Sequence, residues 1–366
     1  MAPPPEQQLS DLLRQRIDLQ GPMTVAEFMY EALQHPRLGY YNRSVVLGRQ
    51  GDFVTAPEIS QIFGELLGLW MLEQWQTLGE PTDFALIELG PGKGTLLSDL
   101  LRITKLIPAF NQSLDLHLVE SSKSLRAIQK KQLRLLTPTW HEDITTLPNK
   151  PALILANEYF DALPIRQFAK SGDDDWREIL VGLVEGKGFG FIMSEKIHPS
   201  QMLAMGASEY AIEELEFIEV SPATKAQVSL LASHLKTVGG SALFIDYGYV
   251  EAEGYNSLQA VRRHQKSDLF DNVGSADLTA HVDFGFLRNA FDQMGLKAFG
   301  PVEQGSFLTA LGLATRLDSL LQNARPGQAE EIQSAAKRLI APYQMGKLFK
   351  VLAVSTHSST PAGFPV

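Results

Sequence analysis

Cysteine is absent from this chain of 366 residues, which excludes disulfide bonds, zinc–thiolate sites and cysteine nucleophiles. No hydrophobic run approaches the ~20 residues that a membrane-spanning helix needs. Residues 1–6 have neither the apolar core of a signal peptide nor the Arg-rich, acid-poor character of a transit peptide. From these absences we expect a cytoplasmic protein without stable membrane anchoring.

Positive charge is also in short supply. The chain has 32 lysines and arginines against 42 aspartates and glutamates, and its net charge at pH 7 is −10. A nucleic-acid-binding surface needs basic residues to neutralise phosphates, so we expect no nucleic-acid partner. The acidic balance is compatible with a cationic substrate. With 44% hydrophobic and 20% charged residues, the composition is that of a globular protein with a sizeable core.

Short apolar runs alternate with helical periodicity from residue 84 onward. This alternation is typical of an α/β fold with a doubly wound, parallel, Rossmann-like sheet. Before it, apolar residues in steps of three and four predict a helix over 60–79. The expected strands are 84–89, 114–119, 153–156, 242–245 and 349–354, and the expected helices between them are 95–103, 124–136 and 224–235.

Two stretches interrupt this alternation. Residues 165–196 alternate apolar and polar positions around turns, one of them the acidic run Asp173-Asp174-Asp175, and predict an antiparallel meander. Residues 250–340 hold a polar loop and then amphipathic helices. The sequence therefore divides into an N-terminal helical extension (1–79), a core (80–164, 215–249 and 341–356), an inserted meander (165–214) and an inserted, substrate-facing helical lobe (250–340).

The strongest local signal is a glycine-rich loop between a predicted strand and a predicted helix. Gly90, Gly92 and Gly94 are spaced G-x-G-x-G, and Glu88 stands at the end of the strand. The loop lacks the first glycine of a phosphate-binding loop and the spacing of a dinucleotide loop. A carboxylate here would repel a pyrophosphate, whereas S-adenosylmethionine carries a cationic ammonium and sulfonium. The pattern favours S-adenosylmethionine as cofactor; the alternative is a helix-entry turn with a solvated Glu88.

Further acids follow the next strands. Glu120 ends the second strand, where a carboxylate commonly holds a ribose diol. Asp143 and Ile144 follow a possible third strand, and we expect Asp143 to accept from the adenine amine while Ile144 flanks the ring. A helix cap or turn is an equally open role for Asp143. Asn157, at the end of the fourth strand, is grouped with the cofactor-binding residues.

The segment after the fourth strand is where a methyl acceptor would meet the donor, because ligands sit at the carboxyl ends of strands. Glu158 and Asp161 lie there among aromatic residues, with Glu58 and Asp246 as possible helpers. Carboxylates can orient an arginine guanidinium by paired hydrogen bonds and localise its charge. The alternative, equally open, is that Asp161 caps a helix and Glu158 only contacts the cofactor.

With these residues in view, the chain resembles the MidA-like methyltransferases, whose mitochondrial members are protein arginine methyltransferases required for complex I assembly. The resemblance extends over nearly the whole chain, and its most specific part is the segment 51–65. The matching motifs begin at His35, Gly51, Glu88, Asn157, Ile245, Asp277 and Gln304.

This resemblance implies a class I methyltransferase fold and symmetric dimethylation of an arginine on the large quinone-site subunit of complex I. It also implies that the N-terminal segment and the Asp277 segment face the substrate, and our substrate-facing candidates are Tyr40, Tyr41, Thr55, Pro57, Asp246 and His281. His281 is also compatible with a structural hydrogen-bonding role. Neither the acids beside it nor the run Asp173-Asp174-Asp175 has the ligand pattern of a metal site, and we expect none.

Two other classes of function stay open from the sequence. A dinucleotide-dependent oxidoreductase would share the general fold. A non-catalytic binding or assembly factor would keep the cofactor pocket without transferring a methyl group, because every candidate acid can also be structural.

Overall fold

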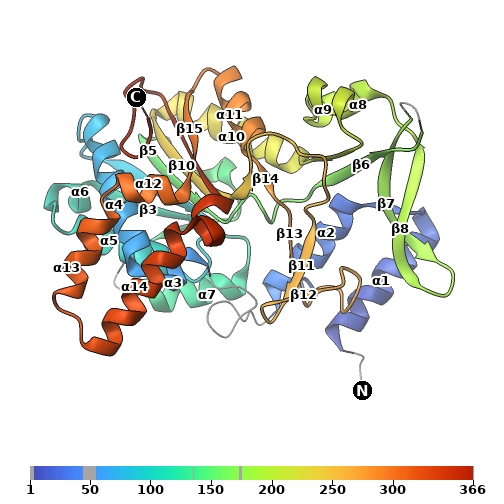
Figure 1. Cartoon of the computed structure of the whole chain (residues 1–366), viewed down its shortest axis with the longest axis horizontal. Helices are drawn as coiled ribbons and strands as arrows, with labels where there is room; N and C mark the ends of the chain where they lie inside the picture. The colour runs from blue at the N-terminus through green and yellow to red at the C-terminus, as the bar shows by residue number, and fades with distance from the viewer. Residues whose placement is uncertain (1–3, 44–54, 135, 173–174, 366) are drawn as a thin grey trace.

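A central β-sheet between two layers of helices forms one half of the molecule, and a smaller sheet with the N-terminal helices forms the other (Figure 1). The computed structural model describes residues 4–43, 55–134, 136–172 and 175–365. Gly51 to Val54 of the resemblance segment and the expected turn residues Asp173 and Asp174 lie outside the described residues.

The central sheet has the strand order β15-β16-β10-β5-β2-β3-β4, and β14 pairs with the end of β10. The strands β10, β5, β2, β3 and β4 run parallel to their neighbours in that series. The order reverses between β2 and β5, because the chain builds outward from β2 in one direction and from β5 in the other. The bounds are β2 (Phe84–Leu89), β3 (Leu114–Val119), β4 (Thr139–His141), β5 (Ala152–Asn157), β10 (Gly240–Tyr249), β14 (Val282–Asp283), β15 (Lys297–Glu303) and β16 (Phe349–Ser355).

All five strands expected from the sequence are present, but the expectation of a wholly parallel sheet is wrong for β16. This strand runs antiparallel to both β10 and β15. Because β16 lies between two neighbours and is buried on both faces, its sequence is apolar from Val351 to Val354, like that of a buried parallel strand. The residue pattern of β16 therefore does not indicate in which direction the strand runs.

Side chains of the sheet alternate between its two faces. In β2, Phe84 and Leu86 join one hydrophobic cluster, whereas Ala85, Ile87 and Leu89 join the other. The first face is covered by α4 (Gln61–Thr77), α5 (Thr95–Thr104), α6 (Pro108–Ser113), α12 (Gln304–Ala310), α13 (Leu313–Leu321), α14 (Pro326–Ile340) and η3 (Pro342–Gly346). The second is covered by η2 (Ile144–Thr146), α10 (Pro222–Val238) and α11 (Phe284–Gln293).

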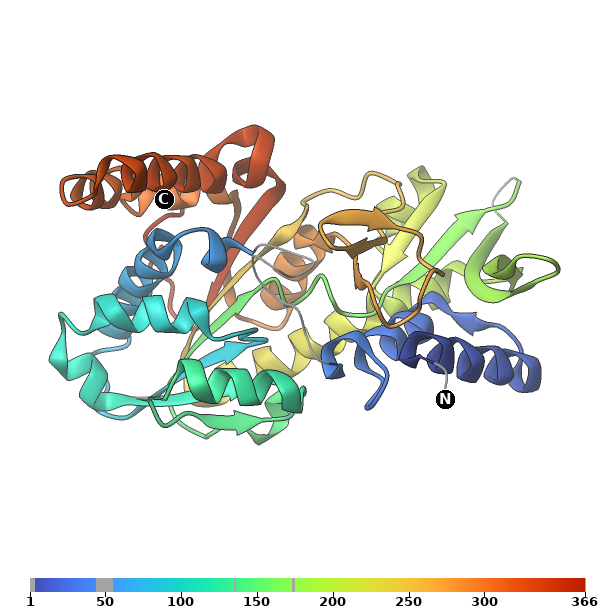
Figure 2. The same ribbon diagram turned by 90° about the horizontal axis from the view of Figure 1, so that it is seen from below.

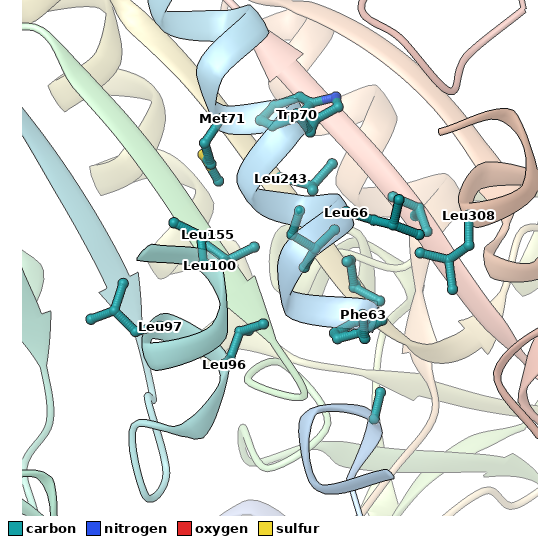
Figure 3. Packing of buried hydrophobic residues seen from close by; sticks show 14 of the residues in the cluster. Phe63, Leu66, Trp70, Met71, Leu96, Leu97, Leu100, Leu155, Leu243 and Leu308 are labelled. Carbon is teal, nitrogen blue, oxygen red and sulfur yellow. The ribbon is translucent and has the colours of Figure 1, made fainter. Parts of the chain in front are cut away.

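Helix α4 packs between the sheet, α5 and the C-terminal helices. Figure 3 shows Phe63, Leu66 and Trp70 on α4 among side chains of α5, the sheet and α12. Gly64 and Gly68 allow α5 to approach closely, since a Cβ at Gly68 would lie 2.3 Å from Ile103 and 2.7 Å from the carbonyl of Leu100. Helix α4 was expected in an N-terminal extension, but it is part of the core that supports the sheet.

The smaller half of the molecule is built from segments far apart in the chain (Figures 1 and 2). Its sheet contains β1 (Met23–Thr24), β6 (Arg166–Lys170), β7 (Trp176–Val184), β8 (Gly188–Lys196) and β9 (Phe217–Val220). Beside it lies a three-stranded sheet of β11 (Gln259–Arg262), β12 (Gln265–Ser267) and β13 (Asp277–Thr279). The helices are α1 (Pro5–Gln20), α2 (Val25–Gln34), η1 (Tyr40–Asn42), α8 (Pro199–Met205) and α9 (Glu209–Glu214).

One hydrophobic cluster joins α1 and α2 to β7 and to residues around β13. The sheets thus cross several boundaries drawn from the sequence. Strands β1 and β9 extend the meander beyond 165–214, and β15, from the expected helical lobe, is a strand of the central sheet. The division into domains itself stays a prediction.

Candidate functional site

A cavity of about 270 Å³ opens at the carboxyl ends of β2, β3 and β5, where the strand order reverses. This is the position at which open α/β sheets bind their ligands. The residues that line it come from both halves of the molecule. They are Gln34, Tyr41, Thr55, Pro57, Glu58, Glu88, Gly90, Pro91, Gly92, Lys93, Thr95, Leu96, Val119, Glu120, Ser121, Leu125, Glu142, Asn157, Glu158, Tyr159, Asp161, Ala162, Leu163, Tyr247, Asp277 and Thr279.

The glycine loop lines this cavity with residues 90–93. Gly92 has a φ of 52°, and a Cβ added there would meet nothing within 4 Å. The left-handed backbone and the open space together leave room for a ligand directly against the main chain. Gly94 does not line the cavity. It precedes α5 as the N-cap residue, and a Cβ added there would lie 3.3 Å from the Leu133 side chain.

Glu88 lies buried at the end of β2, with only 3% of its surface exposed. Its Oε2 atom has no hydrogen-bond partner among the described residues. Burial raises the pKa of this carboxyl to about 8. An unpaired buried carboxyl facing a cavity is well suited to a cationic ligand, which would supply the missing partner and favour the ionised form.

Glu120 follows β3 and is held on both oxygens. The backbone N–H of Ser122 donates to Oε1 at 2.8 Å, and the Gln129 amide donates to Oε2 at 3.1 Å. Burial nevertheless raises the pKa of Glu120 to about 7. Glu120 lines the cavity, where its carboxylate can accept from a ligand hydroxyl.

The two residues expected to hold adenine do not line the cavity. Asp143 is exposed, and its carboxylate accepts from the N–H of Thr145 at 2.8 Å as the N-cap of η2. The hydrogen bonds that the Thr145 hydroxyl and the Thr145 N–H donate to it lower the pKa of Asp143. Ile144 is buried in the core on the second face of the sheet. The preceding residue, Glu142, lines the cavity in their place.

Both candidate acceptor acids reach the cavity. Glu158 adopts a positive φ of 51°, and its Oε1 accepts from Asn157 at 3.1 Å and from the N–H of Ala56 at 3.4 Å. Burial, reinforced by the charge of Asp161, raises the pKa of Glu158 to about 7. Asp161 accepts a 2.7 Å hydrogen bond from the Tyr247 hydroxyl, and burial raises its pKa to about 6.

Asp246 does not line the cavity, and instead binds the backbone of the segment that carries Glu158 and Asp161. Its Oδ2 accepts from the backbone N–H groups of Tyr159, Phe160 and Asp161 at 3.0–3.2 Å. Its Oδ1 accepts from the N–H of Tyr247 at 3.0 Å. With four backbone partners, the carboxylate is fully occupied in shaping the turn that presents Glu158 and Asp161.

The N-terminal candidates divide in the same way. Tyr41, Thr55, Pro57 and Glu58 line the cavity, and Thr95 donates to Glu58 at 2.8 Å. Tyr40 is a buried residue of the cluster around α1 and α2. His281 lies outside the cavity beside a small separate hollow, where it is hydrogen-bonded to the Tyr255 hydroxyl.

Sequence reasoning did not single out Gln129, Glu142 or Asp277. Asp277 accepts from the Tyr41 hydroxyl at 2.9 Å and lines the cavity from β13, in the smaller half of the molecule. Its motif was recognised, but nothing local distinguishes it from Asp283 in the same motif. Gln129 had no signal at all, since it appears as one polar residue in a polar helix.

The cavity is strongly acidic. Seven carboxyl groups line it, from Glu58, Glu88, Glu120, Glu142, Glu158, Asp161 and Asp277, and Lys93 is its single lysine or arginine among the described residues. Within the part of the chain that the structure describes, no three His, Asp or Glu side chains form a group able to hold a metal ion. The arrangement is therefore suited to a ligand or acceptor of positive charge.

Comparison with known proteins supports this interpretation. A model of S-adenosyl-L-methionine-dependent methyltransferases, Methyltransf_28, matches residues 66–302. The chain is 37% identical over 376 residues to "Protein arginine methyltransferase NDUFAF7 homolog, mitochondrial" of Drosophila melanogaster, covering 94% of this chain and 84% of the relative. It is 33% identical to the human "Protein arginine methyltransferase NDUFAF7, mitochondrial", covering 98% and 87%.

Two solved structures of a COG1565 superfamily protein from Burkholderia thailandensis have the same fold. One, bound to S-adenosyl-homocysteine, has a TM-score of 0.82 and 26% identity, covering 99% of this chain and 97% of that chain. The other, a native structure, has a TM-score of 0.81, 25% identity and coverages of 99% and 96%. The expected methyltransferase fold and S-adenosylmethionine as cofactor are confirmed.

The expected cytoplasmic location is wrong, because the curated relatives are named as mitochondrial proteins. That expectation depended on the absence of a leader pattern, and an absent pattern excludes no compartment. Among the described residues, the helices are too short or too polar to cross a bilayer.

Proposed function

Because this chain belongs to the S-adenosyl-L-methionine-dependent methyltransferases of the Methyltransf_28 family, we propose that it methylates an arginine side chain of a protein partner. The observation that carries the proposal is the pair Glu158 and Asp161, which face the cavity beyond the glycine loop. Relatives over nearly the full chain are named as protein arginine methyltransferases, which supports the same acceptor.

The residues around the glycine loop fit the methyl donor. The unpaired Oε2 of Glu88 is available to the ammonium group, and the open surface of Gly92 accommodates the donor's chain against the backbone, beside Gly90. Lys93 is available to the carboxylate, and Glu120 to the ribose hydroxyls. Glu142, rather than Asp143, is the acid available to the adenine amine. When bound, the donor supplies a methyl group activated on a sulfonium.

On the acceptor side, Glu158 and Asp161 would pair with the guanidinium and fix one nitrogen toward the methyl group. Such pairing localises the guanidinium charge away from the attacking nitrogen, which otherwise is a weak nucleophile. Transfer releases one proton from that nitrogen, and a carboxylate with a pKa near 6 or 7 can accept it at neutral pH. Glu58 and Asp277 add negative charge around the same space, and Asp246 maintains the turn.

For the partner we propose a subunit of respiratory complex I, the large quinone-site subunit. This assignment is supported only by the resemblance to MidA-like proteins. The acidic cavity agrees with a protein segment that bears an arginine.

The proposal is tested by binding and by transfer, in that order. Calorimetry should show S-adenosylmethionine and S-adenosyl-homocysteine binding in the micromolar range and no binding of NAD. The protein is then incubated with labelled donor and the purified complex I subunit, and methylated arginine is sought by mass spectrometry. Donor binding without arginine methylation on any partner would favour a non-catalytic assembly factor and would overturn the proposed reaction.

A further inference from the structure

Gln129 connects the parts of the site that surround the cofactor. This residue of α7 (Lys123–Gln132) is fully buried, although its neighbours on the helix are largely polar. Its amide nitrogen donates to the carbonyl of Gly92 at 2.8 Å and to Oε2 of Glu120 at 3.1 Å. Its amide oxygen accepts from the indole N–H of Trp140 at 2.9 Å.

These contacts use both N–H groups and the carbonyl oxygen of one buried primary amide. The two donated bonds require the NH₂ group, and the accepted bond requires the carbonyl oxygen. Gly92 belongs to the loop after β2, Glu120 follows β3, and Trp140 lies in β4 two residues before Glu142. One side chain thus spans the three strand ends that form the cofactor side of the cavity.

We propose that Gln129 is a positioning residue that holds the Glu120 carboxylate and the Gly92 loop at a fixed spacing for binding the cofactor's ribose. Gln129 itself does not line the cavity, so it acts through Glu120 and Gly92. The inference depends on the cofactor site proposed above. It adds a residue on which the orientation of the ribose-binding acid depends.

The chemistry explains why an amide is needed here. A carboxylate at position 129 would face two acceptors, the Gly92 carbonyl and Glu120, and would repel both. An apolar side chain would remove the Gln129 donor from the Gly92 carbonyl and from Oε2 of Glu120, both in a buried place. The Gln129 hydrogen bond also opposes the rise in the pKa of Glu120 that burial causes. The backbone N–H groups of Ser122 and Ser121 and the charge of Arg126 on α7 oppose the same rise. The charge of Glu120 in turn helps to raise the pKa of Tyr159, which follows β5.

The test measures ligand binding to the full chain by calorimetry, with S-adenosyl-homocysteine and adenosine as probes. Gln129→Met removes all three bonds, and Gln129→Glu keeps the shape and the bond from Trp140. We expect each variant to bind each probe about tenfold or more weakly than the wild type at pH 8, because S-adenosyl-homocysteine and adenosine both contain the ribose. Gln132→Glu, an exposed change three positions along the same helix, is the matched control and should bind like the wild type.

Two readouts separate positioning from general loosening of the fold. The pH at which binding is half-maximal should rise by about half a unit or more in Gln129→Met, since Glu120 loses a donor to its ionised form. In the Glu120→Gln background, Gln129→Met should cost at least fivefold less than in the wild type. Equal losses in both backgrounds with an unmoved pH profile would overturn the inference, and so would wild-type affinity in both variants. Failure of the wild type to bind either probe would instead refute the cofactor site.

Discussion

The phenolic hydroxyl of Tyr41 donates a 2.9 Å hydrogen bond to the carboxylate of Asp277, which lies 236 positions later in the chain. The backbone carbonyl of Tyr41 accepts a second bond, at 2.6 Å, from the hydroxyl of Ser122, the N-cap residue of α7. Tyr41 therefore joins the N-terminal segment to the wall beside Asp277 and to the core helix that carries Gln129.

This relationship predicts the behaviour of Tyr41→Phe. The variant keeps the hydrogen bond from Ser122 to its backbone carbonyl and loses the one that the hydroxyl donates to Asp277. The carboxylate of Asp277 is then held less firmly in position. We expect kcat/KM for the protein partner to fall about tenfold, with affinity for S-adenosyl-homocysteine changed less than threefold. Steady-state kinetics and calorimetry measure the two values. A loss confined to cofactor affinity would contradict an acceptor-side role for the pair.

Glu158→Gln separates the two roles left open for that residue. The amide keeps the size of the side chain but removes the charge that would orient a guanidinium. We expect cofactor affinity to stay within about threefold and the transfer rate to fall about a hundredfold or more. Glu330→Gln, an exposed change on α14, serves as the control and should leave both unchanged. Transfer at the wild-type rate would mean that Glu158 does not orient the acceptor.

The raised pKa of Glu88 has a consequence for stability. In the unfolded chain a glutamate titrates near 4.5, whereas burial moves the pKa of Glu88 to about 8 in the folded protein. Between these values the folded state holds a proton that the unfolded state has lost, so stability should fall as pH rises from about 4.5 to about 8. Thermal melts of the ligand-free protein across this range measure the slope.

Glu88→Gln should weaken that slope and raise the Tm at pH 8 by about 2 °C or more, roughly 1 kcal/mol. The same variant should lose cofactor affinity, because the ammonium group loses its partner. A Tm that falls at pH 8 together with normal cofactor binding would show that Glu88 is a structural residue.

Lys93 is expected to bind the amino-acid carboxylate of the cofactor. Since it is the only lysine or arginine among the described lining residues, Lys93→Met should weaken S-adenosyl-homocysteine binding about tenfold. Methylthioadenosine lacks the amino-acid carboxylate, and its affinity should change less than twofold. Competition binding with the two ligands gives the comparison. An equal loss for both would assign Lys93 to the adenosine part or to the shape of the loop.

The contact between α4 and α5 depends on Gly68. A Cβ there would meet Leu100 backbone and the Ile103 side chain well inside contact distance, so Gly68→Ala should destabilise the protein by about 1–3 kcal/mol. Gly327 in α14 has nothing within 4 Å of an added Cβ, and Gly327→Ala should be neutral or stabilising by up to ~1 kcal/mol. Denaturant unfolding of both variants measures the difference. Equal stability would mean that the two helices can separate without cost.

Local pattern was sufficient for the parts of the site that lie within one strand–loop–helix unit. The apolar run of β2 ends at Glu88, and the glycines follow at once, so the acid and the loop reach the same cavity through a few consecutive residues. Glu120 and Glu158 were found for the same reason, since each directly follows a recognisable buried strand, and Asp161 comes three residues after Glu158. The resemblance to a known family added the N-terminal residues Tyr41 and Thr55.

Within a turn, the sequence could not tell which neighbouring side chain faces the ligand. Glu142 and Asp143 are adjacent acids after β4, and only Glu142 lines the cavity because the backbone turns Asp143 toward the N-terminus of η2. Asp246 is a similar case. It follows the rule of an acid near a strand end, but its oxygens are directed at four N–H groups of the adjacent segments.

The sequence by itself therefore determined the α/β architecture, the glycine loop and its acid, because these depend on periodicity and on residues close together in the chain. Only the tertiary structure decided the direction of β16, the pairing of Tyr41 with Asp277 and the role of Gln129. Each of these depends on groups brought together by packing, which leaves no spacing to read along the chain. The acidic cavity depends on both kinds of information. Several of its acids follow individual strands and could be found along the chain, whereas the cavity that they share exists only in the folded protein.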